Sequence, residues 1–388
     1  MLLYIHVPYC AQRCTYCDFY FVTSKTSPAP FLASVEREMA SYGHELGAFD
    51  PIETIYFGGG TPSRLPPEDL VRLIKLASVH FDTSGVREVT VEVNPDDVTP
   101  GYLRVLKQGG VTRLSIGIQS FFADDLKWMN RSHSAEQAEQ SILWARDAGF
   151  DSFSIDLIFG LPDQPPEYWM ANVQKAIRLG APHISAYGLT VEEGTPLGKQ
   201  VARGLVIPAP DDEVADRFSF TQSFLRDAGY EHYEVSSFAK PGQRAVHNSA
   251  YWTHANYVGL GPSAHSFWWG APRSGAHRWD NVRNLARYNA LIEQRRGPVE
   301  NADRLTMDAL ANEYLMLRLR TSDGLNLDTL NQRYAADLLH EKSDDVMMLQ
   351  DEGLLIQDGS TLRLTDSGLL VADAVTSHLL FDDLGRLS

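Results

Sequence analysis

The stretch YIHVPYCAQRCTYCDFYF, residues 4–21, decides the fold and holds all three cysteines of the chain. Cys10, Cys14 and Cys17 follow a short apolar run at the spacing C-x3-C-x2-C. Three thiolates placed in this way can bind three irons of a 4Fe–4S cubane, because thiolate sulfur is the preferred protein ligand of iron–sulfur clusters. A full set of protein ligands takes four cysteines, so we expect the fourth iron to stay open to a small molecule.

Two other interpretations of the cysteines stay open at this point. Free cysteines pack as small hydrophobes, so all three thiols are compatible with simple burial. They also fit a structural zinc site if His6 supplies the fourth ligand, although such sites usually split their ligands into two separated pairs. A disulfide framework is disfavoured because the number of cysteines is small and odd.

The composition bounds the class of protein. A chain of 388 residues predicts two or three domains, because domains average roughly 150 residues. No apolar stretch approaches the roughly 20 residues of a membrane span, and no secretory signal is recognisable at the N-terminus. Reduced thiols and the cluster interpretation favour the cytoplasm. The net charge of −16 argues against nucleic-acid binding, which relies on a basic face.

Six strand-like runs alternate with six amphipathic helical stretches in the first part of the chain. Repeated β-then-α units predict parallel strands with helices outside them, as in a barrel. Six units fall short of the eight of a closed barrel, so the predicted fold is α/β, an incomplete (β/α)6 barrel. The strands are expected at 2–7, 54–57, 88–93, 113–118, 152–158 and 183–189, and the helices near 30–47, 67–81, 99–109, 134–148, 166–179 and 211–228.

Glycine and polar residues gather just after each predicted strand. The cysteines follow the first, and GGGTP at 58–62 follows the second. Asn94-Pro95, Gln119-Ser120 and Gly160-Leu161-Pro162 follow the next three. The carboxyl ends of the strands are where such folds place their chemistry, so the positions of these motifs agree with the predicted topology.

Three segments are expected along the chain. Residues 1–229 form the partial barrel, and residues 230–302 form an aromatic and histidine-rich connecting region that contains HNSAYW at 247–252. Residues 303–388 return to a helical pattern, which is followed by a short strand pair in LLIQDGSTLRLT at 354–365 with Asp358-Gly359 as its turn. Helices followed by a small β-wing predict a C-terminal winged-helix-like domain, and the acidic net charge makes a structural or docking role more consistent than DNA binding.

The motifs together resemble the radical S-adenosylmethionine (SAM) superfamily. C-x3-C-x2-C beside GGGTP is the most specific part. The finer pattern is similar to the branch that contains the oxygen-independent coproporphyrinogen III oxidases and the heme chaperones of the HemW family. It covers most of the chain: YIHVPYC at 4–10, GGGTPS at 58–63, VEVNP at 91–95, SIGIQSF at 115–121, SIDLIFGLP at 154–162 and HNSAYW at 247–252.

This resemblance implies that SAM binds across the strand ends and chelates the open iron, where one electron from the cluster would split its sulfonium bond. The glycines would let backbone approach the ligand closely. Taken alone, Gln119 and Arg131 are more typical of surface positions, whereas Asp156 interrupts an apolar run and is costly to bury without a partner. The implied SAM-binding residues are Tyr4, Tyr16, Gly59, Gly60, Thr61, Glu92, Gln119, Arg131 and Asp156.

Two departures separate this chain from the oxidases of the branch. The oxidases carry a further cysteine two residues after the third, and here that position is Phe19. They also carry an extension before the cluster motif, whereas Cys10 comes almost at once here. We therefore expect a heme chaperone rather than a coproporphyrinogen oxidase, and no catalytic residue is assigned. An oxidase or another tetrapyrrole enzyme, and a zinc-stabilised binding protein, remain the alternatives.

The HNSAYW motif is associated with heme binding in the chaperone branch, so the resemblance implies His247 as the heme ligand. Imidazole is a standard axial ligand of heme iron, and His254 and His265 are rival candidates nearby. The expected cofactors are a 4Fe–4S cluster held by three cysteines, exchangeable SAM, and heme. The expected partners are an electron donor for the cluster and an acceptor hemoprotein, such as a membrane-bound respiratory enzyme.

Overall fold

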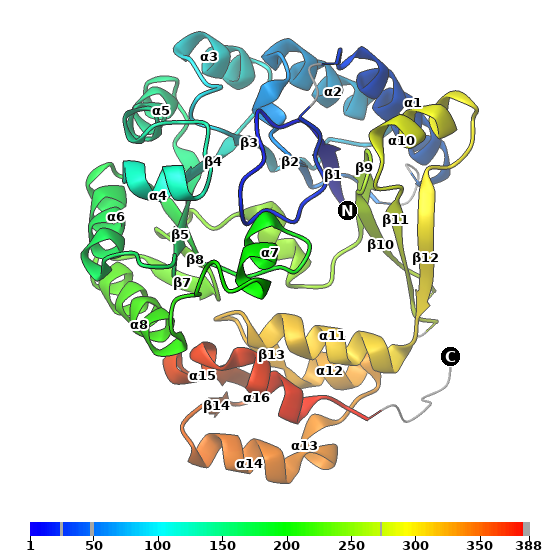
Figure 1. The fold of residues 1–388 in the computed structure, drawn as a ribbon. Helices are drawn as coiled ribbons and strands as arrows, with labels where there is room; N and C mark the ends of the chain where they lie inside the picture. Colours follow the sequence, from blue (N-terminus) through cyan, green and yellow to red (C-terminus); the bar gives the residue numbers. More distant parts are fainter. Residues whose placement is uncertain (24–25, 47–49, 272–273, 383–388) are drawn as a thin grey trace.

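The computed structural model describes residues 1–23, 26–46, 50–271 and 274–382. Its centre is a row of six parallel strands paired in chain order (Figure 1). These strands confirm the predicted ones, with ends that differ by at most two residues. They are β1 (Leu2–Val7), β2 (Thr54–Gly59), β3 (Glu88–Val93), β4 (Arg113–Gln119), β5 (Ser152–Phe159) and β6 (His183–Gly188).

A helix follows each of these strands and covers the outside of the curved sheet (Figure 1). Local signals set several helix starts: Ser134 and Gln137 form a capping box, and the Thr99 hydroxyl accepts the backbone N–H of Tyr102. The six long helices confirm the predicted ones: α1 (Ala29–Leu46), α2 (Pro67–His80), α3 (Pro100–Gln108), α5 (Ala135–Asp147), α6 (Pro166–Arg178) and α8 (Asp211–Asp227). Within the described part of residues 1–229, three short helices were not predicted: η1 (Pro62–Arg64), α4 (Ala123–Trp128) and α7 (Pro196–Ala202).

The strands are apolar on the face toward the helices and polar on the face toward the barrel interior. On β1, Leu3, Ile5 and Val7 belong to the main hydrophobic core, and Tyr4 and His6 alternate with them. Because successive side chains of a strand point to opposite faces, this alternation places rings and hydroxyls inside the barrel. The same alternation carries the polar residues of β3, β4 and β5 to the inner face.

Residues 230–302, expected as a connecting region, contribute strands to both edges of the same sheet. β9 pairs in parallel with β1, and the following strands continue antiparallel from β9. The two outermost strands of the twelve-stranded sheet, β12 and β7, are not hydrogen-bonded neighbours in the strand order, so the barrel stays open. The added elements are β7 (Glu231–Glu234), β8 (Ser237–Ala239), α9 (Val246–Tyr251), β9 (Tyr257–Leu260), β10 (His265–Trp269), β11 (Ala276–Asn281), α10 (Leu285–Glu293) and β12 (Val299–Leu305).

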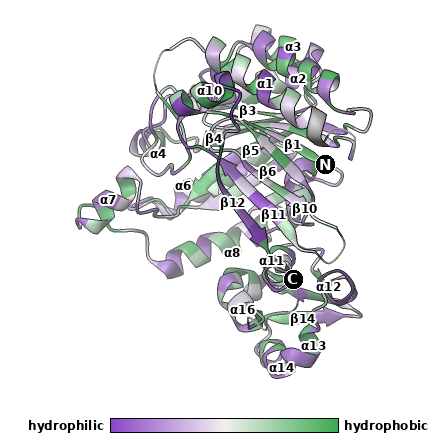
Figure 2. Ribbon diagram, turned by 90° about the vertical axis from the view of Figure 1, so that its right-hand side faces the viewer, coloured by the Kyte–Doolittle hydropathy of each residue, from purple (hydrophilic) through white to green (hydrophobic). Residues whose placement is uncertain are grey.

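A small C-terminal domain lies against one end of the barrel (Figures 1 and 2). It combines helices with a three-stranded antiparallel sheet, as a winged-helix-like domain does. Its own hydrophobic core extends to Phe267 and Ala276 of the large sheet, which fastens it to the barrel. Its elements are α11 (Met307–Leu319), β13 (Leu325–Asn326), α12 (Leu327–Tyr334), α13 (Leu338–Glu341), α14 (Ser343–Asp351), β14 (Leu355–Asp358), β15 (Thr361–Leu364), α15 (Asp366–Leu370) and α16 (Ala372–Leu379).

The turn between β14 and β15 lies one residue later than predicted. Asp358 pairs with Thr361 across the strands, so Gly359 and Ser360 form the turn. Gly359 has a φ of +58°, a conformation that glycine adopts without steric cost, and this fixes the register. Within the described residues, no helix combines the length and the apolar character that crossing a bilayer requires.

Candidate functional site

The three cysteines lie on the loop between β1 and α1, at the carboxyl ends of the parallel strands (Figure 1). The loop is closed at its neck, where the Cys10 backbone N–H donates to the Val22 carbonyl over 3.0 Å. Its tip is held by two backbone bonds, from Thr15 N to the Met129 carbonyl (3.1 Å) and from Leu197 N to the Thr15 carbonyl (2.9 Å). The cysteine loop is therefore held in place by the end of α4 and by α7, across the mouth of the barrel.

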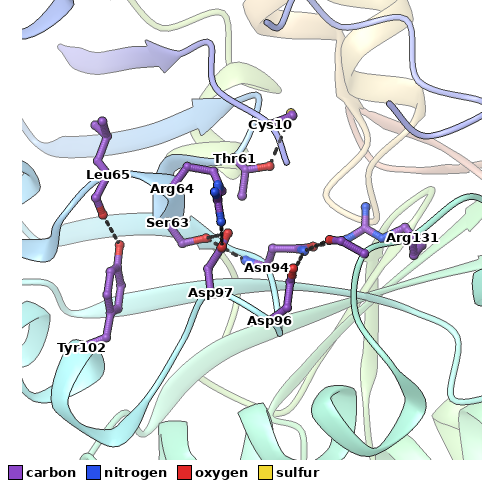
Figure 3. A network of polar contacts seen from close by, with 11 residues as sticks. Cys10, Thr61, Ser63, Arg64, Leu65, Asn94, Asp96, Asp97, Tyr102 and Arg131 are labelled. Carbon is purple, nitrogen blue, oxygen red and sulfur yellow. Dashed lines mark hydrogen bonds and ion pairs between the residues drawn. The ribbon is translucent and has the colours of Figure 1, made fainter. Parts of the chain in front are cut away.

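The thiols are partly buried and lie beside polar groups. The Cys10 Sγ is 3.4 Å from the Thr61 hydroxyl (Figure 3), and the Cys14 Sγ is 3.4 Å from Nη1 of Arg131. Burial raises the pKa of Cys10 to about 11 and that of Cys17 to about 12. Metals bind the thiolate, so loading this site releases protons. The donor set, with three soft sulfur atoms on one loop, fits an iron–sulfur cluster.

The cysteines face a cavity of about 490 Å³, here named the cluster cavity. Residues on or just after each of the strands β1 to β6 line it, which is the convergence that the strand topology predicts. The residues predicted from the sequence that line this cavity are Cys10, Cys14, Cys17, Tyr16, Gly59, Gly60, Thr61, Glu92, Gln119, Arg131 and Asp156.

The glycines after β2 are required by close contact with the cysteine loop. A Cβ on Gly60 would lie 2.9 Å from the carbonyl oxygens of Val7 and Tyr9, closer than such atoms pack. The Gly60 and Thr61 backbone N–H groups donate to these same two carbonyls, over 2.9 and 2.7 Å. Gly59 has a φ of +107°, which side-chain-bearing residues rarely adopt. GGGTP therefore locks the cysteine loop to β2 and leaves backbone exposed to the cavity.

Two half-buried carboxyl groups line the cluster cavity. Burial raises the pKa of Glu92 to about 7, although the Tyr56 hydroxyl donates to Oε1 over 2.8 Å and favours the charged form. Burial raises the pKa of Asp156 to about 6, and the Ser115 hydroxyl donates to its Oδ2 over 3.3 Å. Neither carboxylate makes a salt bridge to a described residue. Both are therefore suited to accept hydrogen bonds from ligand hydroxyl or ammonium groups.

Arg131 supplies the positive charge of the cavity. Its Nη2 donates to the Gly117 carbonyl over 2.9 Å and to the Asn94 side chain (Figure 3). Its Nε is buried without a partner among the described residues. A buried donor without a partner is costly, so this nitrogen marks a place where a ligand acceptor would be favoured.

A second polar network next to the cavity was not assigned from the sequence. Asp97 accepts the Ser63 hydroxyl over 3.0 Å and pairs with Arg64 (Figure 3). Asn94 and Asp97 line the cavity, as do Tyr187 near the end of β6 and Glu192 after it. Their position at or near the carboxyl ends of β3 and β6 is the sequence feature from which their place in the cavity could have been predicted.

The structure does not bring two of the predicted residues to the cluster cavity. Tyr4 stacks on Tyr56 inside the barrel at 6.0 Å between ring centroids and lines a different cavity. His247 is 1 % exposed, and its two ring nitrogens lie 2.7 Å from the Thr54 hydroxyl and 2.9 Å from the Tyr251 hydroxyl. Burial lowers the pKa of His247 to about 3, so its imidazole is neutral. Both of its nitrogens are engaged.

His6, the fourth ligand of the zinc alternative, also lies apart from the cysteines. Its Nε2 is 2.9 Å from the Tyr20 carbonyl, and the ring lines the same separate cavity as Tyr4. A tetrahedral zinc site needs all four ligands to converge on one point, whereas each cluster thiolate binds its own iron. The arrangement therefore fits a cluster better than a zinc site completed by His6.

Comparison with known proteins agrees with this geometry. Residues 4–176 match the radical SAM superfamily, and residues 305–371 match the HemN C-terminal domain. The solved structure of the Escherichia coli coproporphyrinogen III oxidase HemN superimposes with a TM-score of 0.82 at 22% identity, over 98% of this chain and 90% of that one. The fold and the cysteine motif thus define a radical SAM protein of the HemN-like type.

Full-length relatives narrow the assignment. The heme chaperone HemW of Mycobacterium tuberculosis is 35% identical over 97% of this chain and 94% of its own length. HemW of Bacillus subtilis is 33% identical over 93% of this chain and 94% of its own length. The chain belongs to the HemW family of radical SAM proteins.

Proposed function

We propose that this protein is a heme chaperone: it holds a 4Fe–4S cluster on Cys10, Cys14 and Cys17, binds SAM beside it, and passes heme to an acceptor hemoprotein. The observation that carries the proposal is the cluster cavity, in which the three cysteines face polar groups on or just after the six parallel strands. The full-length similarity to proteins named heme chaperone HemW supports the heme part. When bound, the cluster and SAM together supply one-electron chemistry at the open iron.

The side chains that line the cluster cavity suit different chemical groups of SAM. Glu92 and Asp156, half-buried acceptors, suit the ribose hydroxyls or the ammonium group of the ligand. Arg131, with a buried donor unused, suits its carboxylate. The exposed backbone after β2 lets the ligand approach without a side chain in the way. A ligand with hydroxyl, ammonium and carboxylate groups thus matches the lining of the cavity.

Phe19 favours the chaperone over the oxidase. It stands where the oxidases of the branch carry a further cysteine, and it is 66% exposed at the edge of the cluster cavity. A phenyl ring offers neither a ligand for a metal nor a group that transfers protons or electrons. We propose that the protein works in the cytoplasm, receives electrons for its cluster from a separate donor, and delivers heme to a target such as a membrane-bound respiratory enzyme.

Anaerobic reconstitution with iron and sulfide, followed by separate additions of SAM, hemin and coproporphyrinogen III, tests this proposal. We expect hemin to bind and then to move to apomyoglobin, added as a scavenger. We expect coproporphyrinogen III to stay unconverted when cluster, SAM and reductant are all present. Formation of protoporphyrinogen IX would replace the chaperone by an oxidase. Stoichiometric zinc in a protein that cannot be loaded with iron would refute the cluster.

A further inference from the structure

A second cavity, of about 380 Å³, adjoins the cluster cavity and is here named the tyrosine cavity. Aromatic rings dominate its lining: Tyr4, Phe19, Tyr20, Tyr251 and Tyr257. They come from β1, from the end of the cysteine loop, from α9 and from β9, and β1 and β9 are neighbours in the sheet (Figure 1). Flat apolar faces edged with hydroxyl groups are suited to a planar, largely apolar ligand.

Two histidines line this cavity, and one of them has ring nitrogens without a hydrogen-bond partner among the described residues. His6 is buried, with Nε2 held by the Tyr20 carbonyl at 2.9 Å and Nδ1 3.4 Å from the Tyr4 hydroxyl. His265, at the start of β10, is exposed, and its ring makes no hydrogen bond to any residue that the structure describes. An axial ligand must present a free nitrogen lone pair to the iron, and His265 meets this condition.

A cationic group stands at the same cavity. Arg283 is exposed and lines the cavity, and its Nη2 donates to the backbone carbonyl of Asp18. A guanidinium has five N–H donors in a planar fork, so donors remain for a carboxylate. Asp18 also lines the cavity, and its negative charge limits the positive potential there.

We propose that the tyrosine cavity is the heme seat, with His265 as the axial ligand of the heme iron and Arg283 as the partner of a propionate. This inference rests on the proposed chaperone function and names the place of its cargo. An open cavity of this size holds one edge of the porphyrin and leaves the rest in solvent. Cargo that must be handed on requires such access, which the buried imidazole of His247 does not give.

His247 then has a positioning role rather than a bond to iron. Its Nε2 is 2.9 Å from the hydroxyl of Tyr251, and Tyr251 lines the tyrosine cavity. The Thr54 hydroxyl, 2.7 Å from Nδ1, fixes the other side of the ring. Loss of His247 would free the Tyr251 ring and loosen the cavity wall, which weakens heme binding without removing the axial ligand.

Hemin titration of the reconstituted full-length protein, read by absorption and by electron paramagnetic resonance, tests the axial ligand. His265→Ala is expected to lose the histidine-ligated spectrum and at least tenfold in affinity, with cluster content and SAM binding unchanged. His277→Ala removes another exposed histidine from the adjacent strand β11, outside both cavities, and should match the wild type. His247→Ala should weaken binding but keep the histidine-ligated spectrum.

A wild-type spectrum in His265→Ala would overturn the heme seat. If His247→Ala then lost the axial ligand, His247 would be the ligand as the motif implies. A wild-type protein that binds no hemin at all would refute the chaperone function itself, which is a distinguishable result.

The propionate contact is tested with hemin and its dimethyl ester, which lacks carboxylates. Arg283→Gln should weaken hemin binding several-fold and leave the dimethyl ester unaffected. Arg296→Gln, which removes the same charge from an exposed site outside the cavity, should change neither. An equal loss for both porphyrins in Arg283→Gln would contradict a carboxylate contact.

Discussion

The cluster cavity and the tyrosine cavity share a wall at Asp18 and Phe19, yet they are built in different ways. The cluster cavity gathers residues from consecutive βα units, one loop after another. The tyrosine cavity combines β1 with α9, β9 and β10, which follow about 250 residues later in the chain. Parallel topology alone brings the first set together, whereas the second set depends on how the chain returns to the β1 edge.

This difference explains why the position of a motif at a strand end predicted which residues lie near it in space. The motif HNSAYW gave no such prediction, because it does not follow a strand of the parallel row. A residue just after a parallel strand must lie at one edge of the sheet. A residue on a six-residue helix such as α9 can face inward or outward, and packing decides which. His247 turned into the barrel, where Thr54 and Tyr251 engage its ring. The comparison predicts that changes in one cavity leave ligand binding at the other largely intact.

The largest expected effect is the loss of the cluster in Cys14→Ala. With no other cysteine in the chain to replace it, iron and sulfide content after anaerobic reconstitution should fall to near zero. Thr15→Ala is the matched control, because the buried Thr15 hydroxyl has no hydrogen-bond partner among the described residues. The hemin affinity of Cys14→Ala should stay close to that of the wild type. A loss of hemin affinity in this variant would show that the two cavities do not bind their ligands independently.

The next effect concerns pH and stability through Glu92. Its pKa is about 7 in the folded protein, above the ordinary value of 4.5, so the folded state holds this proton more tightly than the unfolded state. Stability should fall as pH rises from about 4.5 to about 7, by roughly 3 kcal/mol for this group. Urea unfolding at several pH values should show a shallower fall for Glu92→Gln. Parallel curves for the two proteins would mean that the carboxylate is already charged at low pH.

A smaller effect is expected on SAM affinity. Asp156→Asn should weaken SAM binding roughly tenfold, because hydrogen bonds to charged groups contribute about 1.5–3 kcal/mol each. Isothermal titration of the cluster-loaded protein gives the measurement. Glu88→Gln changes a buried acid at the other end of the barrel, where both carboxylate oxygens accept backbone N–H groups of α9, and should leave SAM affinity intact. Unchanged affinity in Asp156→Asn would remove this residue from the SAM site.

The smallest effect is expected for Tyr4→Phe. The Tyr4 hydroxyl is 3.4 Å from the His6 ring and outside the cluster cavity, so its removal should change SAM affinity less than twofold. The same variant should alter hemin binding more than SAM binding, because Tyr4 lines the tyrosine cavity. A large loss of SAM affinity, measured by the same titration, would show that Tyr4 contributes to SAM binding, as the family resemblance implies.

The sequence predicted the parallel strands and long helices well because their signals are local. Apolar alternation marks β1 and β3, and caps such as Ser134 mark helix starts. Short elements carry weaker signals: α7 has seven residues, and Gly198 within it packs against the Glu192 carbonyl in a contact that no pattern announces. The use of residues 230–302 as sheet strands depends on long-range pairing, which composition does not reveal.

For the candidate site too, positions set by local signals could be predicted from the sequence, whereas positions set by long-range packing could not. Residues on or just after β1 to β5 line the cluster cavity as the topology predicts, Glu92 and Asp156 among them, whereas the motif Gly160-Leu161-Pro162 after β5 does not reach it. The lining residues after β6 were missed, since that strand end carries no glycine-rich or cysteine motif. Tyr4 and His247 were drawn from family motifs, which name residues without giving the direction of their side chains.

Titration of hemin into the cluster-loaded protein saturated with SAM tests the central claim most directly, with the heme and cluster spectra followed together. The account predicts that heme and SAM bind at the same time, each to its own cavity, and that the cluster signal of the SAM complex persists at saturating hemin. Release of SAM or loss of the cluster as hemin binds would contradict it, because heme would then occupy the cluster cavity.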